Sequence, residues 1–281
     1  MTLSVVHKSC NRTLIGKTYW KSVILPSVLF SSSVIVWREG ELDELQRSEN
    51  SVWRFVMQAP GYTPITALRG EVGASNMKVR DIKGKLKYAK YALENAWGLV
   101  TAVFEDAYNK GYSMFIKTVK GYITRIGLES LEQLRGMTGR ELERTIRNYD
   151  RQQWQCEMQQ KSTLELYRTF KQDITQEIQY DNTFKAALLF RARTNTLNLG
   201  WRNQFQGGDG LCKLCSCGEV ETLEHFMTEC NSLRQERLRF DYEGIDMPQL
   251  LHFVDVLEVG KCQEYLLSIW LERKKILKNK T

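Results

Sequence analysis

The sequence predicts a mainly α protein in which a run of helices is followed by a small cysteine-rich element and a final helix. Prolines are scarce, with four in 281 residues, so few positions interrupt helical hydrogen bonding. No long stretch alternates apolar and polar residues, which is the pattern of half-buried strands. Hydrophobic residues make up 42% of the chain and charged residues 26%, a balance that allows folding around a core.

The first helices are expected in residues 1–100. The apolar run 23–37 contains Pro26 and the serine triplet 31–33 and is shorter than the roughly 20 apolar residues of a membrane span, so we expect a buried helix there. Residues 41–57 have apolar side chains at helical spacing, and turn residues at 59–64 end that helix. Residues 78–97 form the clearest helix, because their apolar side chains recur in steps of three and four.

Residues 101–206 are expected to form a helical connector. Thr138 and Glu141 have the spacing of a capping box, which opens a helix that continues through Trp154. Further helices are expected at 164–178 and 183–195. The glycine-rich loop 207–210 marks the boundary of a third region, residues 207–281, which ends in a helical stretch at 250–280.

Charge is distributed unevenly along the chain. The sequence has 40 Lys and Arg against 33 Asp and Glu, a formal charge of +7. Residues 1–200 hold 29 basic and 20 acidic side chains, whereas residues 201–281 hold 11 and 13. A basic protein favours a polyanionic partner such as RNA or DNA. We therefore expect any phosphate-binding face in the first 200 residues.

A basic stripe accompanies the apolar face of the helix expected at 78–97. Four of its members recur in helical steps of three and four, namely Arg80, Lys83, Lys87 and Lys90, and Lys78 precedes them. We interpret them as candidate contacts with a nucleic-acid backbone, where about four phosphate contacts give a slope of log K on log salt of roughly −3 to −4. An ordinary solvated helix face is the open alternative.

Four of the seven cysteines cluster near the C-terminus, which is typical of a metal site and not of a disulfide framework. The spacing is Cys-x2-Cys, nine residues, then His-x4-Cys. Zinc favours four tetrahedral nitrogen and sulfur ligands, and a structural site fills all four positions. The predicted ligands of a structural Zn²⁺ are Cys212, Cys215, His225 and Cys230. Cys217 is an alternative to Cys215.

Other interpretations of this cluster stay open. The cysteines can be unmetallated thiols. Alternatively, a thiolate paired with His225 can be a nucleophile, although the sequence does not indicate a third group that would orient the histidine. Thr222 is the expected N-cap of a helix that carries His225. The N-terminus has no basic segment leading into an apolar run, so we expect no secretory signal, no membrane partner and a reducing intracellular compartment, cytoplasmic or nuclear.

The cysteine region resembles the Cys-Cys-His-Cys segment of non-LTR, LINE-type retrotransposon polyproteins. Residues 221–226 read Glu-Thr-Leu-Glu-His-Phe and lead to the last cysteine, as in that family. The gap before His225 is one residue longer than the commonest form, which keeps Cys217 open as a ligand. The resemblance continues upstream in the segments 20–29, 45–54, 59–64, 68–75 and 189–194.

This resemblance implies the C-terminal part of a reverse transcriptase. Residues 1–100 would be a thumb-like helical bundle that follows the polymerase palm and grips template and primer, and the partners would be RNA and DNA backbones and the missing palm domain. The sequence has no adjacent pair of aspartates, which palm catalysis uses to hold two metal ions, so we expect no enzymatic activity from this chain alone. The alternative function is a zinc-stabilised protein–protein interaction module with an acidic surface.

Overall fold

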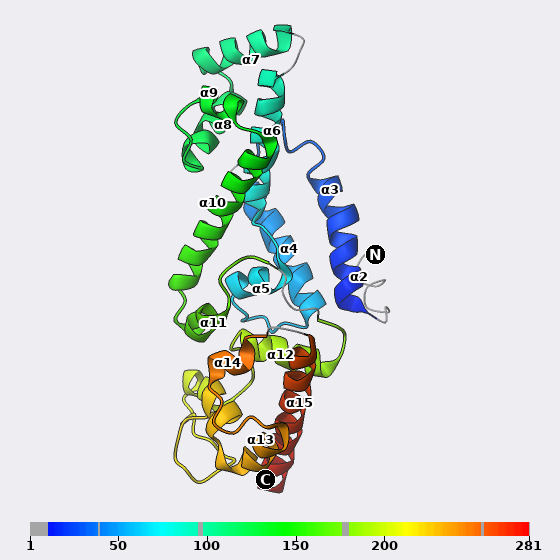
Figure 1. Ribbon diagram of the computed structural model, residues 1–281, viewed down its shortest axis with the longest axis vertical. Coiled ribbons are helices and arrows are strands. Elements are labelled where there is room, and N and C mark those ends of the chain that lie inside the picture. The colour runs from blue at the N-terminus through cyan, green and yellow to red at the C-terminus, as the bar shows by residue number, and fades with distance from the viewer. Residues whose placement is uncertain (1–10, 39, 95–97, 176–179, 254–255, 281) are drawn as a thin grey trace. The chain divides into compact units, whose positions relative to one another are not determined.

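The computed structural model is mainly α-helical, which confirms the predicted fold class (Figure 1). It describes residues 11–38, 40–94, 98–175, 180–253 and 256–280. Within these residues the extended pairing is limited to one isolated antiparallel bridge, between Leu211 and Val220. None of the described helices has both the length and the apolar character needed to cross a bilayer.

The chain forms two compact units, each assembled from segments that are separate in the sequence. Unit 1 comprises the described residues of 1–15, 53–72 and 157–281, and unit 2 comprises those of 16–52 and 73–156. The cysteine-rich element belongs to unit 1 and the basic stripe at 78–90 to unit 2. The consecutive division into 1–100, 101–206 and 207–281 stays a prediction.

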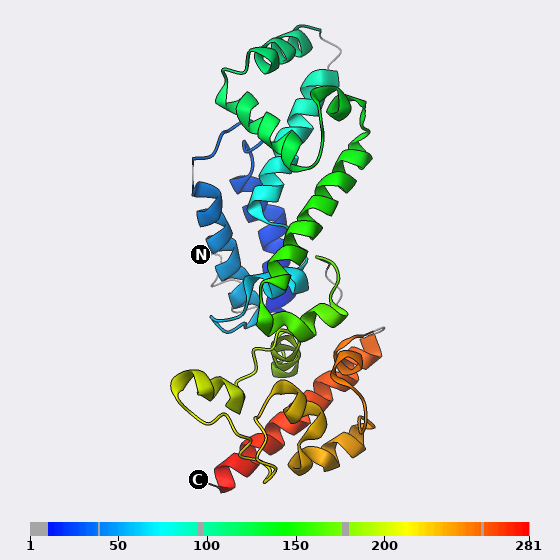
Figure 2. The same cartoon turned by 90° about the vertical axis from the view of Figure 1, so that its left-hand side faces the viewer.

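Unit 2 is built around α6, which packs against α7, α8 and α9 (Figure 2). The apolar stripe predicted on 78–97 forms its core, where Ile82 and Leu86 of α6 meet Val119, Leu134 and Leu142 from other helices. Its helices, including those shared with unit 1, are α2 (Arg12–Tyr19), η1 (Trp20–Ile24), α3 (Leu25–Val28), α4 (Glu41–Met57), α6 (Met77–Glu94), α7 (Gly98–Lys110), α8 (Met114–Arg125), α9 (Leu131–Gly136) and α10 (Gly139–Gln159).

Unit 1 contains the C-terminal half of the chain, in which the long helix α15 packs along α12 and α13 (Figure 2). Phe226, Leu233, Tyr265 and Ile269 are fully buried in it. Its remaining helices are α5 (Ile65–Val72), η2 (Ser162–Leu164), α11 (Glu165–Phe170), α12 (Phe184–Arg193), η3 (Gly200–Gln206), η4 (His225–Glu229), η5 (Asn231–Leu233), α13 (Arg234–Phe240), α14 (Met247–Leu251) and α15 (Val256–Asn279).

Local sequence signals account for several helix ends. Thr138 N donates to Glu141 Oε2 at 2.7 Å, and Glu141 N donates to Thr138 Oγ1 at 3.2 Å, which is the predicted capping box at the start of α10. Thr183 Oγ1 accepts from Ala186 N at 3.3 Å and caps α12. The helix α4 begins and ends at the predicted residues. The predicted helix at 78–97 corresponds to α6, and residues 95–97 lie outside the described part.

The buried helix expected at 23–37 is wrong. The α-helix ends at Val28, and the Phe30 side chain is 89% exposed. Ser32 Oγ donates to the Leu29 carbonyl at 3.0 Å, and such local side-chain bonds favour turns over a continuing helix.

Two other predicted helices are interrupted. The helix expected at 164–178 ends at Phe170, because Lys171 becomes extended and its ammonium bonds to the Thr175 carbonyl; residues 176–178 lie outside the described part. The stretch expected at 250–280 is divided after Leu251, whose carbonyl accepts a hydrogen bond from Arg193 instead of continuing the helical ladder.

Candidate metal centre

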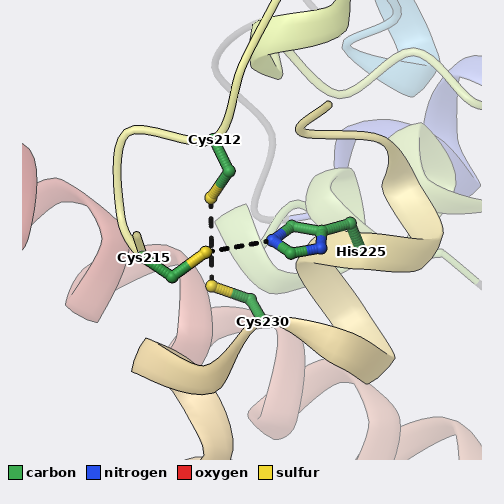
Figure 3. A group of neighbouring side chains, drawn as sticks. All are labelled: Cys212, Cys215, His225 and Cys230. Carbon is green, nitrogen blue, oxygen red and sulfur yellow. Dashed lines mark hydrogen bonds between the residues drawn. The ribbon is translucent and has the colours of Figure 1, made fainter. Parts of the chain in front are cut away.

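The four predicted metal ligands gather at one point of unit 1. Cys212 and Cys215 lie in the loop that follows Gly210, and His225 and Cys230 lie at the two ends of η4 (Figure 3). Their sulfur and nitrogen atoms all lie within 4.8 Å of one another and could hold a metal ion.

The cysteine loop is closed by backbone hydrogen bonds. Cys212 N donates to the Glu219 carbonyl at 2.8 Å, and Glu221 N donates to the Gly210 carbonyl at 2.9 Å. Between them the chain turns at Gly218, whose φ of +76° lies in the left-handed region that glycine adopts without strain. This turn brings the sulfurs of Cys212 and Cys215 to the same side (Figure 3).

A capped π-helical turn presents the other two ligands. Thr222 Oγ1 accepts from His225 N at 3.0 Å, which is the predicted N-cap. Cys230 N then donates to the His225 carbonyl at 2.7 Å, a bond between residues five apart, as in a π-helix. The wider turn places the two residues on one face, although the His-x4-Cys spacing exceeds the step of an α-helix.

The distances within the group fit a tetrahedral ion. Cys212 Sγ and Cys230 Sγ are 3.9 Å apart, and Cys215 Sγ is 3.4 Å from His225 Nε2. With metal–ligand distances of about 2.0–2.3 Å, neighbouring ligand atoms of a tetrahedral site lie about 3.4–3.8 Å apart. Four such ligands leave no open position for water, so the arrangement suits a structural ion.

Burial shapes the chemistry of these ligands. Cys212, His225 and Cys230 are each at most 6% exposed. Burial, with the neighbouring Cys212, raises the pKa of the Cys230 thiol to about 12. A bound cation reverses that preference because it stabilises the thiolate, and the thiol proton is released on binding.

His225 is oriented for binding through Nε2. Its Nε2 faces the sulfurs (Figure 3), while the buried Nδ1 has no hydrogen-bond partner and lies 3.6 Å from Glu229 Oε2. With a metal on Nε2, the ring proton would lie on Nδ1, and the exposed Glu229 carboxylate lies too far away to form a hydrogen bond with it.

Cys217 lies beside the centre but outside the group of four. Its exposed Sγ is 2.8 Å from Cys215 Sγ and 3.8 Å from His225 Nε2. The separation of 2.8 Å is shorter than that between two ligands of one tetrahedral ion. Only one of the two cysteines can therefore ligate with this geometry, and Cys215 is the more buried and the nearer to His225.

The helix α15 holds the centre from one side. Arg273 binds the buried Glu221 through two bonds, from Nε to Oε1 at 2.7 Å and from Nη2 to Oε2 at 2.8 Å. Lys280 Nζ donates to the Lys213 carbonyl at 2.8 Å, between the two loop cysteines. Tyr265 donates to the Met227 carbonyl inside η4. Loop and π-turn are thus both bonded to α15 or to the residue that follows it.

Two segments of the family resemblance meet in a buried ion pair. Arg193 Nη2 lies 3.1 Å from Glu71 Oε1, and both side chains are 2% exposed. Tyr167 donates to Glu71 Oε1 at 3.0 Å and Tyr180 donates to Oε2. Burial opposes ionisation of Glu71, but Arg193, Tyr180 and Lys171 outweigh it and lower the pKa of the carboxyl. These motif residues therefore have a structural role in unit 1.

The basic residues predicted on α6 fall into two groups. Lys78, Lys83 and Lys87 are about half exposed, but Lys78 pairs with Asp43 at 2.8 Å, and Lys83 and Lys87 share Glu143 at 3.2 and 2.5 Å.

The other two residues of the stripe are turned inward. Arg80 binds the fully buried Glu49 at 2.7 Å and its side chain is 14% exposed. Lys90 is 9% exposed and binds Glu94 at 2.5 Å and the Arg135 carbonyl at 3.3 Å. Neither side chain offers a free charge to a partner.

Sequence reasoning missed a stronger cationic face on α10. It consists of four exposed arginines in steps of four, three and four: Arg140, Arg144, Arg147 and Arg151. Within the described residues none of them forms an ion pair. Glu143 links this helix to Lys83 and Lys87, and a depression of about 180 Å³ is lined by Lys83, Glu143 and Arg147. The repeating spacing was the available signal in the sequence.

Comparison with protein-family models, curated proteins and solved structures found no match for this chain.

Proposed function

We propose that the chain is a nucleic-acid-binding module stabilised by Zn²⁺, and that it is the C-terminal part of a LINE-type retrotransposon reverse transcriptase. In the intact protein it would grip template and primer beside the palm domain. The chain alone does not copy RNA in this proposal, because it lacks the adjacent aspartates that two-metal phosphoryl transfer requires.

The nucleic-acid part of the proposal is carried by the unpaired arginines of α10. From residue 140 to residue 151 an α-helix rises about 16 Å, a length that spans about five phosphates along one strand of a duplex. Arginine suits this role because its planar guanidinium binds two phosphate oxygens at once. Lys83 and Lys87 extend the face, although Glu143 neutralises part of their charge.

The choice of zinc is supported by the donor set. Three thiolates and an imidazole are soft ligands that favour zinc over magnesium or calcium, which prefer oxygen. The closed tetrahedral spacing supports a structural ion. The element between Cys212 and Cys230 is too small to bury a core of its own, so metal binding would supply part of its folding free energy.

A salt titration of labelled RNA and duplex DNA tests the nucleic-acid proposal. We expect a slope of log K on log salt of roughly −3 to −4 for the unmodified chain. The double variant Arg144→Glu with Arg147→Glu should weaken binding by about tenfold or more and flatten the slope by about two. The matched control is Lys161→Glu with Lys278→Glu, which reverses two exposed lysines elsewhere and should bind as the unmodified chain does.

Two results would reject the nucleic-acid proposal. One is the absence of binding at about 50 mM salt, where phosphate contacts are strong. The other is an equal loss of affinity in the α10 variant and in the control, since that result would mean that only the net charge of the chain matters.

A protein–protein module is the second candidate, and one observation favours it. Val256 and Leu257 at the start of α15 are 84% and 83% exposed, and Glu219, Glu224 and Glu229 are exposed around the metal centre. If either of these two surfaces carried the function, reversing the arginines of α10 would leave partner binding unchanged.

A further inference from the structure

A pocket of about 590 Å³ lies within unit 2. It is bounded by the segment that precedes α4, by the first turns of α4 and α6, and by one face of α8. Its size is that of sites that bind small molecules, about 300–1,000 Å³. It involves neither the metal centre nor the arginines of α10.

Four cationic side chains line this pocket: Arg38, Lys78, Lys117 and Arg125. Asp43 neutralises Lys78 at 2.8 Å. The other three are exposed, and in the described part of the chain no carboxylate pairs with them. Among the described lining residues, these four cations outnumber the two carboxylates, Asp43 and Asp81, which favours an anionic ligand.

The inner wall holds two aromatic rings on a buried carboxylate. Trp37 Nε1 donates to Asp81 Oδ1 at 3.0 Å, and Tyr122 donates to Asp81 Oδ2 at 2.6 Å. Lys85, which is fully buried, pairs with Asp81 and donates to the Ser32 carbonyl at 2.9 Å. This network neutralises Asp81 inside the protein and fixes the two rings, so the wall is preorganised.

Gly121 keeps the α8 side of the pocket open. It lies in the middle of α8, where glycine costs about 1 kcal/mol relative to alanine. A Cβ at this position would meet no atom within 4 Å, so packing within the protein does not require the glycine. A larger side chain here would extend from the wall of the pocket that Gly121 lines.

We propose that this pocket binds a nucleoside phosphate. The phosphate would lie on Arg38, Lys117 and Arg125, and the base would contact the Trp37 and Tyr122 rings, since bases stack on aromatic side chains. The ligand chemistry has two sources, a free mononucleotide or the phosphorylated 5′ end of a nucleic-acid strand. This inference does not depend on the proposed function, because it uses different residues.

Isothermal titration calorimetry with four probes tests the pocket in the full chain. Adenosine monophosphate and adenosine form one arm, and a short oligonucleotide with a 5′-phosphate or a 5′-hydroxyl forms the other. We expect the phosphorylated member to bind more tightly by about tenfold or more, because charge-assisted hydrogen bonds to a phosphate are stronger than bonds to a neutral hydroxyl. Preference in the first arm indicates a free nucleotide, and preference in the second arm alone indicates a strand end.

The variants locate the binding. Gly121→Leu should abolish it by filling the space, and Lys117→Glu with Arg125→Glu should weaken it by about tenfold or more through charge reversal. Lys161→Glu is the control and should bind as the unmodified chain does, with thermal unfolding showing that each variant folds. Equal affinity for phosphorylated and unphosphorylated probes, or unchanged binding in Gly121→Leu, would overturn the proposal. Loss of long RNA binding in the α10 variant with retained adenosine monophosphate binding would show that the two sites are independent.

Discussion

The environment of His225 favours metal binding by the Cys-Cys-His-Cys group over nucleophilic catalysis. Nε2 of this residue faces the sulfurs and lies 3.4 Å from Cys215 Sγ, while the buried Nδ1 on the other side of the ring can carry the ring proton. A nucleophilic pair would need a base that a third group orients, yet Glu229 stands 3.6 Å from Nδ1 and is largely exposed. Metal binding at Nε2 requires no rearrangement of these side chains.

Removal of single ligands tests the assignment at the residue scale. We expect one tightly bound Zn²⁺ per chain, lost in His225→Ala and in Cys230→Ala, because three ligands and a water bind a structural ion less tightly. Cys217→Ala is the matched control and should retain the metal. Metal content by mass spectrometry after dialysis against a chelator gives the readout, and stoichiometric zinc in His225→Ala would contradict the assignment.

Glu71 allows a prediction on acid stability. Its pKa is lowered in the folded chain, so unfolded chains bind more protons and stability falls as the pH drops from about 4.5 through the folded pKa. Glu71→Gln should therefore show a shallower loss of unfolding free energy between about pH 5 and pH 3 than the unmodified chain. It should also be less stable near neutral pH by about 3–5 kcal/mol, because Arg193 is left buried without its partner.

Urea unfolding across this pH range, followed by circular dichroism, measures both effects. Comparing the variant with the unmodified chain cancels the release of metal in acid, which both share. A parallel pH dependence of the two proteins would show that Glu71 does not contribute to acid unfolding.

At the scale of the element, the regular helices were predictable and the interruptions were not. The helices α4 and α6 carry apolar side chains at helical spacing, and the Thr183 cap marks the start of α12, which is buried along most of its length. The end of α14 depends on Arg193, which lies 58 residues away in sequence and bonds to the Leu251 carbonyl. The local sequence around Leu251 does not indicate such a distant hydrogen-bond partner.

In the candidate site, too, some features were predictable from the sequence and others were not. The spacing of cysteines and histidine predicted the four ligands and the Thr222 cap, whereas the π-turn that brings His225 and Cys230 to one face has no sequence signature. The basic stripe on α6 was visible, but Glu49 and Glu143, which neutralise Arg80 and Lys83, are 31 and 60 residues distant. Periodicity shows which residues share a helix face, but it does not show whether the charges on that face already pair with residues elsewhere in the chain.

Thr222, which caps the helical turn leading into η4, provides the prediction at this scale. Thr222→Ala removes the oxygen that accepts from His225 N, so the start of the turn loosens and zinc affinity should fall by about 10–100-fold, as for other supporting residues of metal sites. Thr222→Ser keeps the oxygen and should restore the affinity.

Thr228→Ala is a control in the same turn, since its hydroxyl bonds only to the Glu224 carbonyl. Competition with a chromophoric chelator measures the affinities. A similar loss in Thr228→Ala would mean that the turn tolerates no change and that the cap has no particular role.

In the whole molecule, most of the net positive charge and the candidate metal centre belong to different units. Unit 2 has 19 basic and 14 acidic side chains in its sequence segments, a net +5 of the total +7. Unit 1 holds the Cys-Cys-His-Cys group. The sequence placed the charge in the first 200 residues, but it could not show that 53–72 and 157–200 fold with the metal element, because that depends on contacts such as Glu71 with Arg193.

This separation predicts how the chain responds to loss of its metal. The core of unit 2, from Val79 to Ile146, contains no residue of the cysteine element, so its opening free energy should not depend on zinc. The loop at 212–220 and the π-turn η4 have little core of their own and should lose protection when a chelator removes the ion. Hydrogen exchange with and without chelator should therefore show faster amide exchange in residues 211–230 and unchanged exchange in α6 and α8. Uniform acceleration across both units would show that the fold of the whole chain depends on the metal, and identical exchange in both conditions would show that the centre does not bind one.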